Sequence, residues 1–153
     1  MIIRHPITEE AAAICALFAD EVRAGRMLPR TQEEIAAHPD DWLVAEKNGQ
    51  VVGCVSLVDY SRTLCEIRSL AVDPAYRGNG IASRLVSAGL DLACERGTST
   101  VLVLTRAAHL FETLGFRYDS VTNFPEKVWR DCAPCPFRHA CDEVALTYHC
   151  GGR

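Results

Sequence analysis

The segment Glu66–Val86 constrains the fold of this 153-residue chain more than any other, because it joins a strand, a glycine turn and a helix without a break. Alternating and continuous apolar residues predict a strand over Leu64–Val72, which an Asp-Pro pair ends. Gly78 and Gly80 follow, and the apolar spacing of Gly80–Arg96 predicts a helix. Backbone N–H groups in such a turn can approach a ligand closely, and the positive end of the helix attracts an anion. The turn is a candidate anion site; an ordinary strand–turn–helix connection is the alternative.

Shorter elements are predicted on both sides of this segment. Thr8 and Thr31 are expected N-caps, and Glu34 completes a capping box with Thr31. The Asn48-Gly49 pair predicts a type I′ hairpin. Strands are expected at 2–3, 42–46, 51–58, 64–72, 98–105, 116–121 and 144–148, and helices at about 9–24, 31–38, 80–96 and 107–114. This order predicts an α/β fold with a mixed sheet and helices on both faces, including a right-handed crossover near 64–105.

Length and charge narrow the functional classes. A chain of 153 residues predicts a single domain, 1–153. The net charge of −4 argues against a broad basic face, so no nucleic acid is expected as a partner. No stretch approaches the ~20 apolar residues of a membrane helix, and the first ten residues lack the apolar region of a signal peptide. We therefore expect no membrane partner and a cytoplasmic location.

The glycine turn also resembles a known family. Arg77-Gly78-Asn79-Gly80-Ile81-Ala82 matches the R/Q-x-x-G-x-G/A signature of the GNAT superfamily of acetyl-CoA-dependent N-acyltransferases. The flanking AVDPAYRGNGIASRLV and the later LFETLGFRY are similar to the same family, so the resemblance covers about residues 1–120. It implies a GNAT-like, mixed but mostly antiparallel central sheet with helices on both faces, followed by a Cys-rich C-terminal extension at 121–153.

The resemblance implies acetyl-CoA as cosubstrate. Backbone N–H groups of the turn would hold the pyrophosphate at the helix N-terminus, and the end of the preceding strand would bond the pantetheine arm as an added strand does. In this family that strand and the VLVL strand also splay apart to admit the thioester. The implied cofactor-binding residues are Leu70, Ala71, Val72, Arg77, Gly78, Asn79, Gly80, Ile81 and Ala82.

Glu66 is the leading candidate for the general base, since the acceptor amine arrives largely as an ammonium and must lose a proton before it attacks the thioester. GNAT enzymes often carry a glutamate at this place. On a strand, Glu66 and Arg68 point to the same face, so a simple ion pair between them is the alternative.

The general acid is less clear from the sequence. Many GNAT enzymes place a tyrosine in the late helix to protonate the leaving thiolate, but the nearest aromatic in AAHLFETLGF is Phe111, which has no hydroxyl. Either the CoA thiolate leaves without an acid, or His109 serves.

Three segments resemble a narrower group, the short bacterial N-acetylglutamate synthases of arginine biosynthesis. They are GRMLPRT at 25–31, CEIRSLAVDP at 65–74 and PEKVWRDCAPCPFRHACDEVAL at 125–146. The resemblance implies L-glutamate as the acceptor, whose two carboxylates need cations. Arg30 and Arg68 are the favoured substrate-binding residues and Lys127 is a weaker one; a solvated charge is the alternative for each.

The eight cysteines fall into two groups. With no secretion signal, all eight are expected to be reduced thiols, and Cys15, Cys54, Cys65 and Cys94 to be core residues without a nucleophilic role. Cys132, Cys135 and Cys141 have the spacing of a zinc site, with Cys150 as the expected fourth ligand and His139 or His149 as alternatives. An iron–sulfur cluster, buried thiols and a redox disulfide also remain open.

Three functions follow from the sequence. The leading one is direct acetylation of a small-molecule amine, with glutamate as the expected acceptor and a homodimer as a further expectation. The second keeps the transferase but changes the acceptor to another small amine or a protein terminus. The third is a non-catalytic module that senses acetyl-CoA or a metal.

Overall fold

The computed structural model describes residues 1–128 and 143–151. These residues form two compact units, each built from two separate stretches of chain. Unit 1 comprises Met1–Val58 and Ile67–Leu92, and unit 2 comprises Asp59–Glu66 and Ala93–Arg153. The boundary falls within one strand, directly after Glu66.

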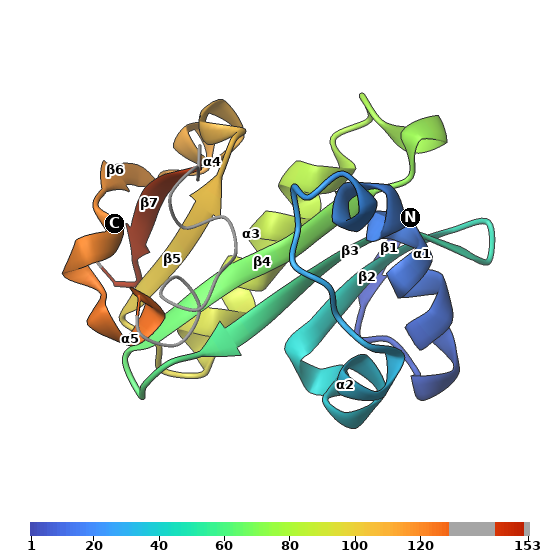
Figure 1. Cartoon of the computed structure of the whole chain (residues 1–153), viewed down its shortest axis with the longest axis horizontal. Helices are drawn as coiled ribbons and strands as arrows, with labels where there is room; N and C mark the ends of the chain where they lie inside the picture. The colour runs from blue at the N-terminus through green and yellow to red at the C-terminus, as the bar shows by residue number, and fades with distance from the viewer. Residues whose placement is uncertain (129–142, 152–153) are drawn as a thin grey trace. The chain divides into compact units, whose positions relative to one another are not determined.

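One seven-stranded sheet runs through the described residues, in the order β1-β2-β3-β4-β5-β7-β6 (Figure 1). The strands are β1 (Ile2–Arg4), β2 (Trp42–Lys47), β3 (Gln50–Asp59), β4 (Leu64–Val72), β5 (Thr100–Thr105), β6 (Arg117–Asp119) and β7 (Val144–His149). The β4–β5 pair is parallel, whereas β1–β2, β2–β3, β5–β7 and β6–β7 are antiparallel. The mixed, mostly antiparallel sheet expected from the sequence is confirmed.

Helices of 3 to 15 residues connect these strands. They are η1 (Thr8–Glu10), α1 (Ala11–Arg23), α2 (Gln32–Ala37), η2 (Pro39–Asp41), η3 (Pro74–Tyr76), α3 (Ile81–Glu95), α4 (Ala108–Thr113), η4 (Val121–Asn123) and α5 (Pro125–Lys127). No helix among the described residues is long and apolar enough to cross a membrane.

Local sequence signals fix several boundaries as expected. Asn48 and Gly49 both have positive φ, 53° and 77°, as a type I′ hairpin requires. The Thr31 side chain accepts a hydrogen bond from the Glu34 N–H and caps α2. The expected cap at Thr8 is wrong, because Thr8 lies inside a 3₁₀ turn that precedes α1.

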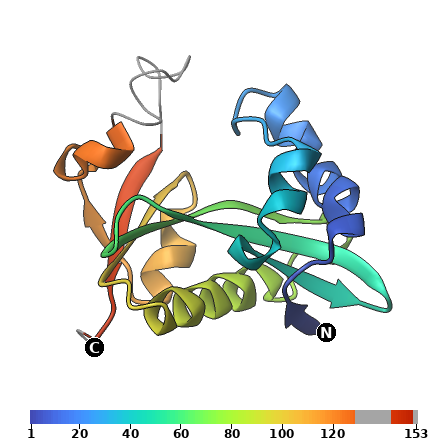
Figure 2. The ribbon, with the colours of Figure 1, turned by 90° about the horizontal axis from the view of Figure 1, so that it is seen from below.

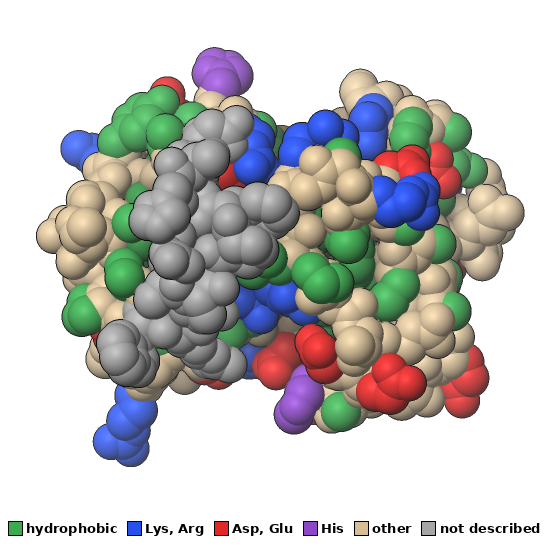
Figure 3. All heavy atoms as spheres, in the orientation of Figure 1, with side chains coloured by type: hydrophobic (Ala, Val, Ile, Leu, Met, Phe, Trp, Pro, Cys, Tyr) green, Lys and Arg blue, Asp and Glu red, His purple; other side chains and the backbone are tan. Residues whose placement is uncertain are grey.

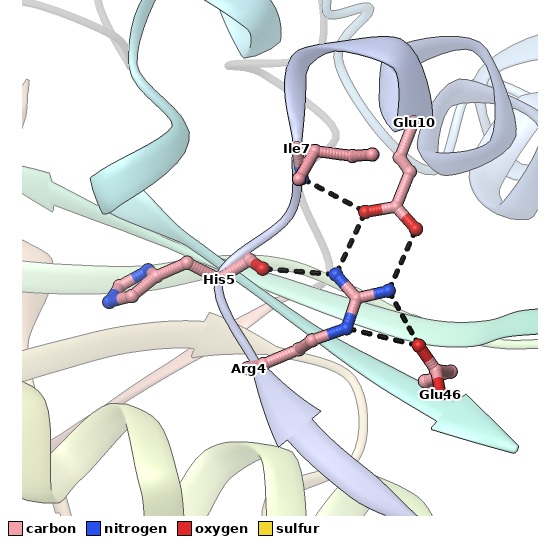
Figure 4. A network of polar contacts seen from close by, with 5 residues as sticks. All are labelled: Arg4, His5, Ile7, Glu10 and Glu46. Atoms are coloured by element: carbon pink, nitrogen blue, oxygen red, sulfur yellow. Dashed lines mark hydrogen bonds and ion pairs between the residues drawn. The ribbon is translucent and has the colours of Figure 1, made fainter.

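An arginine clamp takes the place of that cap. Arg4 of β1 contacts Glu10 through two nitrogens, at 2.9 and 2.8 Å, and reaches Glu46 of β2 at 2.8 Å (Figure 4). Glu10 also accepts a hydrogen bond from the Ile7 N–H. The hydrogen bonds from Arg4 lower the pKa of the Glu10 carboxyl. The clamp therefore ties the first strand to the start of α1 and to the neighbouring strand.

Unit 1 packs helices on both faces of its strands. α1 and α2 cover one face through a core of Ile14, Phe18, Ile35 and further apolar side chains, and α3 lies on the other (Figure 2). At Gly53 a Cβ would lie 2.9 Å from the Leu85 side chain. Glycine there lets α3 approach β3 closely, which fixes the N-terminus of α3.

Figure 3 shows acidic side chains gathered around α2, which carries Glu33 and Glu34 in its first turn. Both residues are exposed. They lie at the positive end of the helix, where carboxylates stabilise it.

Unit 2 uses the C-terminal extension as an inner strand. β7 lies between β5 and β6 and pairs with all six residues of β5. Leu64, Leu102 and Ala145 form a buried cluster on one face, under Val121 and Phe124. The strand expected at 144–148 is confirmed as β7, and it completes the sheet of unit 2.

Candidate functional site

Glu66 occupies the last position at which β4 pairs with β5. The parallel ladder joins Leu64 to Thr100 and ends with Glu66 opposite Leu102, although both strands continue. Glu66 lies on the same face as Leu64 and Leu102 and is only 2% exposed. A carboxylate so deeply buried needs partners, because an isolated buried charge is strongly unfavourable.

Two side chains from distant segments supply those partners. The Tyr60 hydroxyl donates to Glu66 Oε1 at 2.6 Å, and the Lys127 ammonium donates to the same oxygen at 3.0 Å. Lys127 is 6% exposed, and its Nζ lies 5.9 Å from the centre of the Tyr60 ring. We call Tyr60, Glu66 and Lys127 the carboxylate cluster. The hydrogen bonds from Tyr60 and Lys127 to the carboxylate are charge-assisted, and such bonds are shorter and stronger than neutral ones.

The structure pairs Glu66 with Lys127, which the sequence suggested as a weaker substrate-binding residue. Arg68 is half-buried and its backbone carbonyl accepts from the Ser56 hydroxyl at 3.1 Å. No local pattern in the sequence marks Tyr60, and none pairs Lys127 with Glu66, which lies 61 residues away.

Ser69 changes the direction of the side chains along β4. Its φ is +57°, a left-handed conformation that is costly for a residue other than glycine. Before it, Ile67 lies on the α3 face, where a Cβ on Gly89 would contact it at 3.5 Å. After it, Ala71 packs on the α1 side. Strict alternation would put Ile67 and Ala71 on the same face, so Ser69 inverts the pattern before the glycine turn.

The glycine turn has the geometry of an anion site. Gly78 and Gly80 have φ of 83° and 77°, and a Cβ on either would meet nothing within 4 Å. The Asn79 side-chain amide donates to the Tyr76 carbonyl at 3.0 Å and braces the turn. α3 begins at Ile81, and the first N–H groups of a helix have no partner within it. The space and the donors fit a phosphate group.

The turn is also tied to the strand before it. The Arg77 side chain donates to the Val72 carbonyl at 3.2 Å, and the Asp73 side chain accepts from the Ala75 N–H. Leu70 and Ala71 are half-buried, and Ala82 lies in the first turn of α3. Every residue that the resemblance assigns to acetyl-CoA thus lies in unit 1, along one stretch from β4 to α3.

The expected arginines also lie in unit 1. Arg30 follows α1 in the loop before α2, is half-buried, and donates to the Pro29 carbonyl at 2.9 Å. The Cys15 thiol lies 3.6 Å from the Arg30 carbonyl. The Nε atoms of Arg30 and Arg68 are both buried from solvent. These positions keep both side chains as candidates for a carboxylate.

α4 supplies no tyrosine hydroxyl as a general acid, because its aromatic residue is Phe111. Phe111 is 2% exposed and packs edge-to-face on Phe116, with ring centres 5.3 Å apart. His109 on the same helix is exposed. Phe111 is therefore a core residue.

The cysteines differ from expectation at one pair. Cys94, at the end of α3, forms a disulfide with Cys150, directly after β7. The expectation that both are reduced thiols is wrong, and Cys150 does not fit a metal site because its sulfur is already bonded. Burial raises the pKa of the free thiols Cys54 and Cys15, which agrees with the absence of a nucleophilic role.

The other expected metal ligands, Cys132, Cys135 and Cys141, lie outside the described residues, as does His139. Within residues 1–128 and 143–151, no group of three His, Cys, Asp or Glu side chains is placed to hold a metal ion. His149 instead lies 3.3 Å from the Thr100 hydroxyl.

Comparison with known proteins places this geometry in context. The model of the Acetyltransferase (GNAT) family matches residues 11–116. The chain is 39% identical to an uncharacterized N-acetyltransferase of Chlorobaculum tepidum, across 94% of this chain and 93% of that protein. It is 28% identical to an amino-acid acetyltransferase of Ectopseudomonas mendocina, across 80% of this chain. The chain spans only 29% of the length of that longer relative.

Two solved structures share the fold closely. An N-acetylglutamate synthase of Neisseria gonorrhoeae, complexed with coenzyme A and N-acetyl-glutamate, has a TM-score of 0.83 at 25% identity. That comparison covers 97% of this chain and 35% of the other. A Mycobacterium tuberculosis protein solved in complex with CoA has a TM-score of 0.81 at 25% identity, and covers 97% and 99%. These likenesses confirm the expected fold class.

Proposed function

The chain belongs to the acetyltransferase (GNAT) family, and we propose that it transfers the acetyl group of acetyl-CoA to the α-amine of an amino acid, with L-glutamate as acceptor. The observation that carries the catalytic part of this proposal is the carboxylate cluster, in which a buried Glu66 is held by two donors on one oxygen. Such an arrangement presents an oriented carboxylate, which a proton acceptor requires.

Unit 1 supplies the binding of acetyl-CoA in this proposal. The backbone N–H groups of Arg77–Ala82 bind the pyrophosphate, and the open space at Gly78 and Gly80 admits it. The β4 residues Leu70–Val72 lie beyond the ladder with β5 and bond the pantetheine arm through their backbone.

The chemistry needs one proton acceptor and no covalent intermediate. Glu66 takes a proton from the acceptor ammonium, directly or through one water, and the free amine attacks the thioester carbonyl. The C–S bond breaks and CoA leaves as a thiolate. Because Phe111 has no hydroxyl and a thiol is a far better acid than an alcohol, we assign no side chain as the acid.

Glutamate as acceptor is supported by the relatives and by two arginines. The N-acetylglutamate synthase of Neisseria gonorrhoeae matches 97% of this chain. Arg30 and Arg68 are half-buried guanidinium groups that could each bind a carboxylate. The C-terminal segment PEKVWRDC, which suggested this group from sequence, supplies Lys127 to the carboxylate cluster.

A panel of amines tests the proposal. CoA release is followed with a thiol reagent in the presence of L-glutamate, L-aspartate, L-glutamine, D-glutamate and a polyamine. We expect turnover with L-glutamate, weaker turnover with aspartate or glutamine, and none with the polyamine. Turnover with the polyamine alone would favour a different acceptor class. Acetyl-CoA binding without turnover on any amine would favour a non-catalytic module.

A further inference from the structure

We propose that Lys127 is a positioning residue of this site: it keeps the Glu66 carboxylate ionised and oriented, and it does not bind the acceptor. The inference rests on the proposed role of Glu66 as the base. It moves Lys127 from the substrate-binding role suggested by the sequence to a role exerted through Glu66.

The burial of the pair supports this role. Lys127 and Glu66 are 6% and 2% exposed, and the ammonium lies 3.0 Å from Glu66 Oε1. Two charges this deep in a protein are stable only when each compensates the other. Loss of Lys127 would remove a positive charge 3.0 Å from the carboxylate, so the carboxylate would retain its proton to a higher pH.

Tyr60 fixes the orientation of the same oxygen. Its hydroxyl donates to Oε1 at 2.6 Å, a distance in the range of hydrogen bonds to an ionised oxygen. The Tyr60 ring packs against Leu64, Leu102 and Ala145. A tyrosine held by an apolar cluster directs the carboxylate but cannot supply the positive charge, and Lys127 supplies that charge.

Two charged residues of β6 lie on this face, farther along the sheet. Arg117 and Asp119 lie on β6, three strands from β4, or about 14 Å at ~4.8 Å per strand. Asp119 accepts hydrogen bonds from Thr147, Asn123 and the Ser120 N–H. His149 lies beside Thr100, and Arg68 is two residues along β4. Tyr60 and Lys127 each contact Glu66 directly.

The test compares Lys127→Met with Lys127→Arg. The pH dependence of kcat/KM is measured for both, with saturating acetyl-CoA and varied L-glutamate. In Lys127→Met we expect the acid limb of the profile to move about 1–3 pH units to higher pH, with the KM for glutamate changed less than twofold at the new optimum. Lys127→Arg, which keeps the charge, should restore the limb to within half a unit.

A raised KM for glutamate with an unmoved acid limb would overturn the proposal and return Lys127 to substrate binding. Failure of Lys127→Arg to restore the limb would overturn it as well. Glu126→Gln, an exposed neighbour in α5, is the matched control and should leave both quantities unchanged. If Lys127→Met does not fold, Lys127→Gln, which keeps a donor without the charge, replaces it.

A second readout separates this proposal from the proposed function. The side-chain carboxyl carbons of glutamate are labelled with ¹³C, and the Glu66 signal is identified by its loss in Glu66→Gln. This signal should titrate at higher pH in Lys127→Met than in the unmodified protein, whether or not any amine is acetylated. An unchanged titration would overturn the role of Lys127. A shifted titration in a protein that acetylates no amine would overturn only the proposed function.

Discussion

The glycine turn of unit 1 and the carboxylate cluster of unit 2 are built in opposite ways. The turn offers backbone N–H groups from six consecutive residues, Arg77–Ala82, for the proposed binding of acetyl-CoA, and its geometry follows from two glycines. The cluster uses three side chains drawn from the β3–β4 hairpin, from β4 and from α5. The proposed site for the cosubstrate is therefore encoded locally, whereas the carboxylate proposed as the base has a partner 61 residues away.

The largest effect should come from the cluster. Glu66→Gln keeps the shape of the side chain but removes its ability to accept a proton, and we expect kcat with glutamate to fall about 10²–10⁴-fold. The Kd for acetyl-CoA, measured by calorimetry, should change less than twofold, because the turn is untouched. Loss of both binding and turnover would mean that the two regions are not separable.

The second-largest effect is expected from loss of the disulfide, which tests how far the stability of unit 2 depends on long-range contacts. Cys94 and Cys150 close a loop with a sequence separation of 56. Replacing both by serine should lower the free energy of unfolding by about 2–4 kcal/mol. Urea unfolding measures the change, and dithiothreitol should destabilise the unmodified protein but not the double variant. Equal sensitivity of both to the reductant would show that this bond does not stabilise the fold.

Gly80→Val tests the turn directly. The left-handed φ of 77° is unfavourable for a β-branched residue, and the new side chain would occupy the space assigned to the phosphate. The Kd for acetyl-CoA should rise about 10–100-fold, which corresponds to about 1.4–2.8 kcal/mol. Gly49→Val is the matched control, because Gly49 has the same φ and open surroundings but lies in the β2–β3 hairpin. Equal weakening of acetyl-CoA binding by both variants would remove the turn as the site.

The arginine clamp gives a pH-dependent effect within unit 1. The pKa of Glu10 is lowered by its hydrogen bonds from Arg4, so the stabilisation is present above the unfolded pKa of about 4.3 and is lost as pH falls through the folded value. Arg4→Met should lower the free energy of unfolding by about 1 kcal/mol at pH 7. The difference from the unmodified protein should shrink between pH 5 and pH 3 in urea unfolding. A difference that stays constant with pH would contradict this coupling.

The smallest effect is expected at His109. It is exposed on α4, and no acid is needed if CoA leaves as a thiolate. His109→Ala should change kcat less than twofold, as followed by CoA release. A fall of tenfold or more would identify His109 as the acid and add α4 to the reacting region.

Local features of the fold were predictable, and distant contacts were not. The sequence predicts β4 with its observed bounds, the Asn48-Gly49 hairpin and the glycine turn, since each depends on neighbouring residues. It misses the left-handed Ser69, because no residue type there requires that conformation. It also misses the insertion of β7 between β5 and β6, because strand order depends on the packing of the whole unit.

The candidate site divides in the same way. The residues proposed to bind acetyl-CoA follow from a motif of neighbouring residues. No motif marks Tyr60 or pairs Lys127 with Glu66, and Cys150 was expected at a metal but bonds Cys94. The whole fold decides which of these distant side chains meet. Because the chain has several basic residues, tyrosines and cysteines, the sequence alone could not identify the partners of Glu66 or Cys150.

The most direct test of the central claim follows the product itself. Acetyl-CoA carrying a ¹³C-labelled acetyl group is mixed with ¹⁵N-labelled L-glutamate and the protein, and ¹³C–¹⁵N coupling is recorded by NMR while CoA release is measured with a thiol reagent. We expect N-acetyl-glutamate to form at the same rate as free CoA, and both signals to be lost in Glu66→Gln. Release of CoA without the ¹³C–¹⁵N bond, or formation of the bond at an unchanged rate in Glu66→Gln, would contradict this expectation.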